Sequence, residues 1–261
     1  MRWELLWILV LIGMPCKAQY GARAMGMGGL DLYSRGIYAT LGNPAGATFT
    51  PALSIMSGYA SLHVPGLQTL YLSLLIPFKS LVYGISLQRE GDEWLNEFKA
   101  SFLAAHQLGN TSLGLRLNYH QLSVKDLDSR GGISIDAGGI SKFNEYNFLS
   151  AYLTNTTLSR VFPKDLLPVY FRIGWINTSL EYLRIHFSLE KEVDLPLLLS
   201  AGLEYSPVEW ISLRIGLSQE PLKFHGGLGL RWEKWALDFG IMKHPLLTMK
   251  HELTLIFTSE N

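Results

Sequence analysis

Apolar and polar residues alternate with a period of two from about residue 53 to the end of the chain, and this pattern limits the fold more than any other. In LKFHGGLGLRW, residues 222–232, almost every second position is apolar, while lysine, histidine and arginine stand between them. WALDFGI at 235–241 and YLRIHFSLE at 182–190 repeat the pattern. Such alternation is typical of β-strands with one apolar and one polar face. No convincing helical repeat interrupts it, so the sequence predicts a single all-β domain.

About fourteen segments follow this pattern, and each has roughly the 9 to 11 residues that a tilted strand needs to cross a bilayer. The predicted strands are 53–62, 67–77, 80–89, 95–107, 111–121, 131–140, 145–155, 168–177, 181–191, 197–206, 209–218, 222–232, 234–243 and 248–258.

A soluble sandwich or barrel and a membrane barrel with its apolar face outward both fit this alternation. A soluble β-protein of this size keeps many charges on its outer face, whereas the polar face here mixes charged residues with glycine. That mixture is typical of a lumen in which charges pair across a narrow interior. We therefore predict an all-β transmembrane antiparallel β-barrel of about 14 strands. The polar residues expected to face the lumen are Arg116, Asp136, Arg172, Arg184, Glu204, Arg214, Arg231 and Asp238.

The lengths of the connections also favour a membrane barrel, because periplasmic turns are short and external loops are longer in outer-membrane barrels. If residue 53 starts on the periplasmic side, the short connections near 78, 108–110, 206–207 and 233–234 all follow even-numbered strands. The longer ones at 89–94, 122–132 and 156–167 follow odd-numbered strands. The later external loops are short as well, so the alternation is imperfect.

The first 18 residues, MRWELLWILVLIGMPCKA, combine an early arginine, an apolar run from Leu5 to Ile12 and a small residue at Ala18. This is the pattern of a secretory signal peptide, and we expect cleavage after Ala18. A retained membrane anchor is the weaker alternative, because the apolar run is shorter than the roughly 20 residues that span a bilayer. Lipidation at Cys16 is disfavoured, because the residues before it are not small.

The remaining chemistry is sparse. Removal of residues 1–18 would leave no cysteine, which excludes a disulfide scaffold and a cysteine nucleophile. The net charge is zero, with 22 acidic and 22 basic residues, so we predict no nucleic-acid partner. The seven histidines form no ligand-spaced cluster, and we predict no metal and no cofactor. His186, Ser188 and Glu190 share one strand face, but no nucleophile motif supports a barrel hydrolase.

Residues 19–52 precede the first predicted strand and are rich in glycine and alanine. Such a segment is either a periplasmic tail or an insertion into the lumen. Small residues permit tight turns and close approach of backbones, which a plug in a narrow pore requires. We therefore predict a signal peptide at 1–18, a plug at 19–52 and a barrel at 53–261. The predicted plug motif consists of Gly21, Arg23, Gly26, Gly28, Gly29, Asn43, Pro44 and Gly46.

The two parts of this motif, GARAMGMGG at 21–29 and NPAG at 43–46, resemble the N-terminal signature of the PorV/PorQ-type barrels of Bacteroidota. More distantly, they are similar to the FadL-like transporters of hydrophobic compounds. SIDAGGI at 134–140, AYLTNTTLS at 151–159 and AGLEYSP at 201–207 extend the resemblance along the chain. The chain departs from the pattern between the two motifs, where YSRGIYATLG replaces the usual acidic residues.

This resemblance implies a non-enzymatic outer-membrane barrel of fourteen strands. Its first implied function is an accessory or docking component of type IX protein secretion, with secretion-system proteins as partners. The alternative is a FadL-like transporter, with a hydrophobic small molecule as ligand. Membrane lipid is a partner in both cases. A lipid-acting barrel enzyme is a third hypothesis, and it would require the serine, histidine and carboxylate of 186–190 to meet at one rim.

Overall fold

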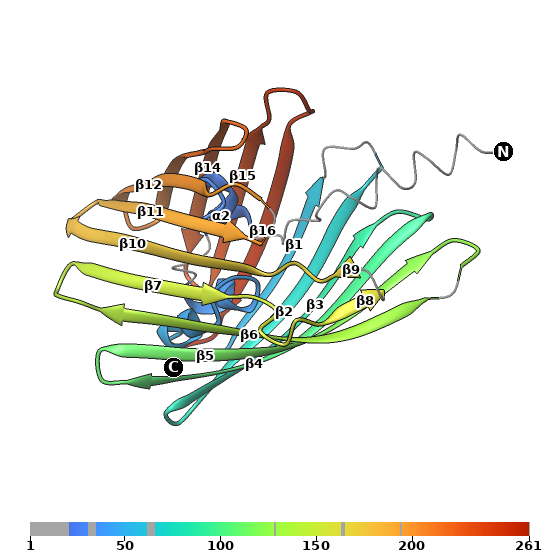
Figure 1. Ribbon diagram of the computed structural model, residues 1–261. Coiled ribbons are helices and arrows are strands. Elements are labelled where there is room, and N and C mark those ends of the chain that lie inside the picture. The colour runs from blue at the N-terminus through green and yellow to red at the C-terminus, as the bar shows by residue number, and fades with distance from the viewer. Residues whose placement is uncertain are drawn as a thin grey trace.

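The computed structural model describes residues 21–30, 35–61, 66–127, 129–162, 165–193 and 195–260. The predicted signal peptide and residues 19 and 20 lie outside these ranges. In the described part of the chain, fourteen strands form one closed antiparallel barrel, in which β1 pairs with the last strand, β16 (Figure 1).

The barrel strands are β1 (Ser54–Ser61), β2 (Gln68–Phe78), β3 (Leu81–Gly91), β4 (Leu95–Leu108), β5 (Thr111–Val124), β6 (Arg130–Lys142), β7 (Asn147–Leu153), β10 (Tyr170–Leu180), β11 (Leu183–Glu192), β12 (Leu198–Val208), β13 (Ile211–Ser218), β14 (Lys223–Trp232), β15 (Trp235–Lys243) and β16 (Lys250–Thr258). Each corresponds to one predicted strand, so the prediction of an antiparallel barrel of fourteen strands is confirmed. The period-two pattern was enough to predict these strands, because each wall strand has one apolar and one polar face.

The outer face of the barrel is apolar. On β5, for example, Leu113, Leu115 and Leu117 are 48%, 58% and 48% exposed, while the residues between them are buried inside. A soluble barrel has the reverse arrangement, with its apolar residues inside, so the soluble alternative is wrong. An apolar exterior around a closed ladder is the arrangement that lipid requires, because no backbone group is left unpaired at an edge. None of the helices in the described ranges is long and apolar enough to cross a membrane.

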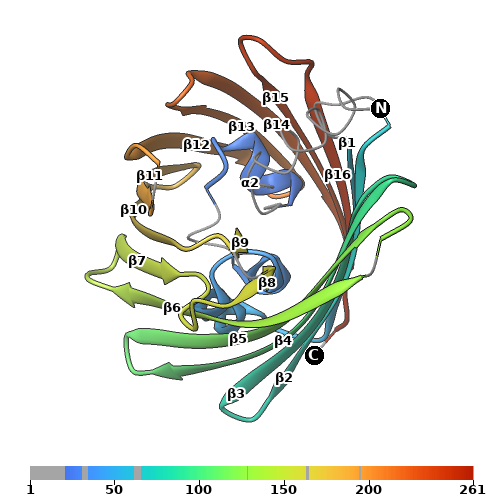
Figure 2. The same ribbon diagram turned by 45° about the vertical axis from the view of Figure 1, so that its right-hand side comes forward.

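The connection after β7 holds two short strands that the sequence did not predict. β8 (Arg160–Phe162) and β9 (Asp165–Leu166) form a small separate sheet in the predicted loop 156–167. This hairpin lies inside the ring of barrel strands in Figure 2. Gly132 of β6 lets it come close, since a Cβ on Gly132 would lie 2.8 Å from the carbonyl oxygen of Arg160.

The segment before β1 lies inside the barrel, where three short helices run between the walls (Figures 1 and 2). They are α2 (Ala22–Gly26) and the 3₁₀ helices η1 (Gly36–Thr40) and η2 (Pro44–Phe49). Helices this short are not stable alone in water. Only η2 has a side-chain cap, in which Asn43 Oδ1 accepts a hydrogen bond from the Ala45 amide at 3.0 Å. Contacts with the wall therefore hold this segment, which we call the N-terminal segment (residues 21–30 and 35–52).

Candidate functional site

The candidate site is the interface between the N-terminal segment and the barrel wall. Its first part is a set of glycines on the inner face of the wall that leave room for the backbone of 21–29. A Cβ added to Gly202 would lie 2.5 Å from the Met27 carbonyl oxygen, and one on Gly240 would lie 2.4 Å from that of Ala22. No side chain fits at such distances, so these positions bring two backbones into direct contact.

The glycines of the segment itself have the same function. A Cβ on Gly26 would lie 2.9 Å from the Cα atom of Gly227. Gly28 has a φ of 84°, which an L side chain rarely adopts, and its Cβ would lie 2.9 Å from the Leu217 carbonyl oxygen. The spacing of small residues in GARAMGMGG is therefore explained by packing against β12–β15.

The NPAG motif packs against the other side of the barrel interior, on strands β5–β7. The fully buried Asn43 donates its Nδ2 hydrogens to Ser150 Oγ at 2.9 Å and to the Ala151 carbonyl at 3.1 Å. A Cβ on Gly138 would lie 1.9 Å from Asn43 Oδ1, and one on Gly114 would lie 2.5 Å from the Ala45 amide nitrogen. Asn43 thus joins β6 and β7 to the segment, and Pro44 starts η2 directly after it.

A charged cluster fixes α2 to the wall. Arg23 donates to both carboxylate oxygens of Glu204, each at 2.9 Å. Glu204 also accepts from Arg214 Nε at 2.7 Å and from Arg184 Nη1 at 2.6 Å. Glu204 is fully buried and receives four charge-assisted hydrogen bonds, which are the strong kind. Burial would lower the pKa of Arg23, but the Glu204 carboxylate raises it above its ordinary value, so Arg23 stays charged.

The cluster continues through Arg214 to Asp238 and returns to the N-terminal segment. Arg214 Nη1 lies 2.6 Å from Asp238 Oδ1, and the Tyr38 hydroxyl donates to Asp238 Oδ2 at 2.5 Å. Burial and the neighbouring Asp238 carboxylate raise the pKa of Tyr38 well above its ordinary value, so its hydroxyl keeps the donated proton. Tyr38 lies in the stretch that replaces the usual acidic residues, and the sequence alone did not identify it.

A second cluster holds the chain between η1 and η2. Arg116 donates to the carbonyl oxygens of Thr40 at 3.0 Å and Gly42 at 2.9 Å, and it pairs with Asp136 at 2.7 Å. It also contacts the Tyr152 hydroxyl. Asp136 Oδ1 accepts from the Asn155 amide at 2.9 Å, which fixes the point where the chain leaves β7.

The structure brings most of the predicted lumen residues together in these clusters. Arg172 pairs instead with Glu190 on the neighbouring strand. Arg231 lies at the end of β14 with an exposed side chain, and Arg184 is partly exposed. The hypothesis of a barrel hydrolase at His186, Ser188 and Glu190 stays a prediction.

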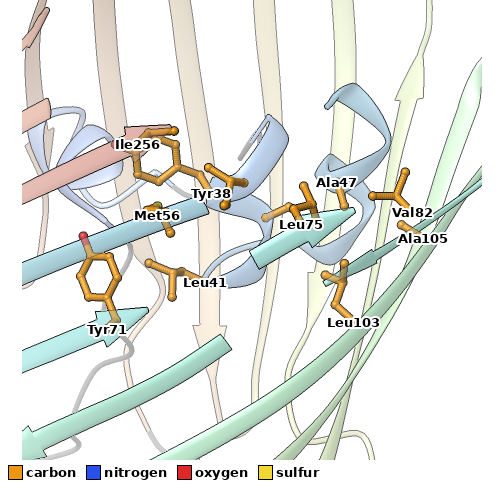
Figure 3. Packing of buried hydrophobic residues seen from close by; sticks show 12 residues of the cluster. Tyr38, Leu41, Ala47, Met56, Tyr71, Leu75, Val82, Leu103, Ala105 and Ile256 are labelled. Carbon is orange, nitrogen blue, oxygen red and sulfur yellow. The ribbon is translucent and has the colours of Figure 1, made fainter. Parts of the chain in front are cut away.

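A further part of the contact surface of the segment is apolar. Residues of η1 and η2 pack against β1–β4 and β16 in a cluster without any charged member (Figure 3). Leu41 and Ala47 come from the segment, while Leu75, Val82 and Leu103 come from the wall. We call this the apolar seam; its members are Ile37, Tyr38, Ala39, Leu41, Ala47, Met56, Tyr71, Leu75, Val82, Leu103, Ala105 and Ile256.

A cavity of about 430 Å³ adjoins the apolar seam at the end of the barrel that carries the short turns. Val82 belongs both to the seam and to the cavity wall. Thr48 and Thr50 line it from the N-terminal segment, and Lys79 and Gln107 line it from the wall side. Threonine, lysine, serine and glutamine side chains make up most of its lining, in contrast to the mainly apolar lining of sites for small hydrophobic ligands.

No protein-family model and no curated protein matches the chain. Several solved structures match its fold. A deletion mutant of the TodX monoaromatic hydrocarbon channel matches with a TM-score of 0.70 at 12% identity, over 91% of this chain and 96% of that one. The chain has the fold of the FadL-type outer-membrane barrels. The Pseudomonas putida toluene transporter TodX matches with a TM-score of 0.65 at 12% identity, over 92% and 97%. A Pseudomonas aeruginosa FadL homologue gives 0.57 at 12%, over 91% and 98%.

Proposed function

We propose that the protein is a non-enzymatic passage for hydrophobic small molecules across the outer membrane, with the N-terminal segment as its plug. The observation that carries this proposal is the asymmetry of the plug interface. The Arg23–Glu204 ion pair and hydrogen bonds from Arg116 and Asn43 hold the plug against β5–β7 and β11–β15, whereas its contact with β2–β4 is mainly the apolar seam, with one long hydrogen bond from Ser86 to the Thr40 carbonyl at 3.4 Å. The fold shared with TodX and the FadL homologue supports the same function.

The two sides of the interface differ in what it costs to open them. Removing one partner of a buried ion pair costs about 3 to 5 kcal/mol, because the other charge is left uncompensated. An apolar molecule that enters the seam replaces apolar contacts with apolar contacts, so little burial is lost. The plug would therefore stay anchored on its charged side while a hydrophobic molecule passes between η1–η2 and β2–β4. The cavity beside Val82 then lies on the path to the periplasm.

The test is to fill the seam. Ala105 of β4 is buried in the seam, and Ala104 is its neighbour on the lipid-facing side of the same strand. We expect Ala105→Phe to lower toluene entry at least about tenfold and Ala104→Phe to leave it unchanged. The assay is an intracellular toluene reporter in a Gram-negative host without its own hydrophobic-compound channels. Equal entry through both variants at equal barrel levels in the membrane would contradict the proposed route.

Docking in type IX secretion stays a prediction from the PorV/PorQ resemblance. The motif that carries this resemblance is packed inside the barrel: among its eight residues only Gly29 is even partly exposed. The motif is thus accounted for by the plug, and a docking surface would have to lie elsewhere. Purification from outer membranes in mild detergent, with mass spectrometry of what stays bound, separates the two functions. A stoichiometric partner protein without a hydrophobic ligand would favour docking.

A further inference from the structure

A groove of about 350 Å³ lies on the outer face of the barrel, where the short turn between β6 and β7 meets β10. Its lining consists of Phe143, Asn144, Asn147, Leu149 and Trp175. Leu149 lies on the outward face of β7 and is 49% exposed, and Phe143, in the turn, is 76% exposed. The groove is therefore continuous with the apolar surface that faces lipid.

The strand register sets an apolar row of side chains beside a polar row at this groove. Leu149 pairs with Trp175 across β7–β10, and Trp175 pairs with Phe187 across β10–β11. The next outward row toward the turns pairs Asn147 with Asn177. Two residues along a strand cover about 7 Å, so the lining changes from apolar to amide groups over that distance. A membrane lipid changes in the same way, from acyl chain to ester and phosphate groups.

The amide groups of the groove offer a donor, while their acceptors are in use. Asn144 Oδ1 accepts hydrogen bonds from the backbone amides of Tyr146 and Asn147 at 3.0 and 2.9 Å. Asn147 Oδ1 accepts from Trp175 Nε1 at 3.0 Å and from Asn177 Nδ2 at 2.9 Å. A backbone amide and an indole only donate, so the orientation of both asparagine side chains is fixed. The Asn144 NH₂ group donates to no described residue, so it can donate to a ligand.

We propose that this groove binds one phospholipid from the membrane leaflet at the short-turn end. The acyl chain lies along Leu149 and the stacked rings of Trp175 and Phe187, whose centroids are 5.9 Å apart. The Asn144 NH₂ group donates to an ester or phosphate oxygen of the lipid. Periplasmic turns are short in outer-membrane barrels, so this leaflet is the periplasmic one.

Both rows of the lining are needed to select this ligand. A purely apolar molecule would leave the Asn144 donor unpaired in an apolar environment, which costs free energy. Inorganic phosphate would pair with the donor but would leave Leu149 and Trp175 without an apolar contact. An amphiphile with acceptor oxygens next to an acyl chain satisfies both rows, and the surface that carries the groove already faces such molecules.

The test is a lipid titration of the barrel purified from outer membranes. Phosphatidylethanolamine is added to the protein in a mild detergent, and native mass spectrometry counts the lipids that stay bound. Asn144→Asp keeps the oxygen that accepts from the two backbone amides, but it removes the NH₂ donor and adds a negative charge. We expect it to weaken binding of the first lipid at least about tenfold, as for the loss of a hydrogen bond to a charged group. The matched control is Asn110→Asp in the exposed turn between β4 and β5, which should bind like the wild type.

Equal affinity in the wild type and Asn144→Asp would overturn the proposal, and so would a titration without a preferred first lipid. If Asn144→Asp fails to fold, Phe143→Ser is the second variant, because its side chain is exposed. It should weaken the first lipid at least about fivefold through lost apolar contact, whereas Phe78→Ser, at the turn between β2 and β3, should not. A phospholipid with a photoreactive acyl chain then locates the site. Crosslinks concentrated on 143–149 and Trp175 would support the groove, and crosslinks spread evenly around the barrel would refute it.

Discussion

Glu204→Gln is the substitution that most directly tests whether ion pairs anchor the plug. Glu204 accepts four hydrogen bonds, two from Arg23 and one each from Arg184 and Arg214. Glutamine keeps the shape of the side chain, but it is uncharged and presents an NH₂ group to a guanidinium. The cluster of three arginines, Glu204 and Asp238 would change from a net charge of +1 to +2 in a buried site.

Breaking a buried pair by removing one partner costs about 3 to 5 kcal/mol, and we expect a loss of that size in the free energy of unfolding. The assay is urea unfolding of the barrel in lipid vesicles. Glu209→Gln is the matched control, since Glu209 is exposed in the turn between β12, which carries Glu204, and β13. Adding Arg23→Met to Glu204→Gln returns the cluster to +1 and should recover part of the loss. A loss below about 1 kcal/mol for Glu204→Gln, or no recovery in the double variant, would refute the view that this cluster anchors the plug.

Two further predictions concern the seat of NPAG and the buried tyrosine. Gly138→Ala should destabilise the protein by about 1 to 3 kcal/mol, because its Cβ would lie 1.9 Å from Asn43 Oδ1. Gly139→Ala should be nearly neutral in the same unfolding assay, because its Cβ would lie at ordinary contact distances, 3.5 Å from Leu113 and 3.9 Å from the Ser112 carbonyl oxygen. The pKa of Tyr38 is raised in the folded state, so above about pH 10 the unfolded chain loses a proton that the folded protein keeps. The stability that this proton contributes is present below about pH 10 and is lost above it. The unfolding free energy of Tyr38→Phe should therefore fall less than that of the wild type between about pH 9 and 11. An equal fall in the two proteins would contradict the role of Tyr38.

The barrel was predictable because its cause is local. Each strand has one face toward lipid and one toward the interior, so alternation alone predicts its position and orientation. The partners inside the barrel are not local. Arg23 and Glu204 are 181 residues apart, and Tyr38 and Asp238 are 200 apart. The pattern placed glycines on the inner face, but it did not show that the NPAG backbone packs against Gly114 and Gly138. The β8–β9 hairpin was missed because its strands are too short to show a period.

The charged residues on the polar face of the strands pair with one another and with the N-terminal segment. Charges along a lumen favour polar solutes when water fills the pore. Here the charged side chains form ion pairs and hydrogen bonds with the plug and with one another; they are Glu204, Arg214, Asp238, Arg116 and Asp136. A polar solute would have to separate these pairs, whereas an apolar solute on the proposed route would meet mainly the hydrophobic contacts of the seam. Under the proposed function, these paired charges would therefore oppose the passage of polar solutes.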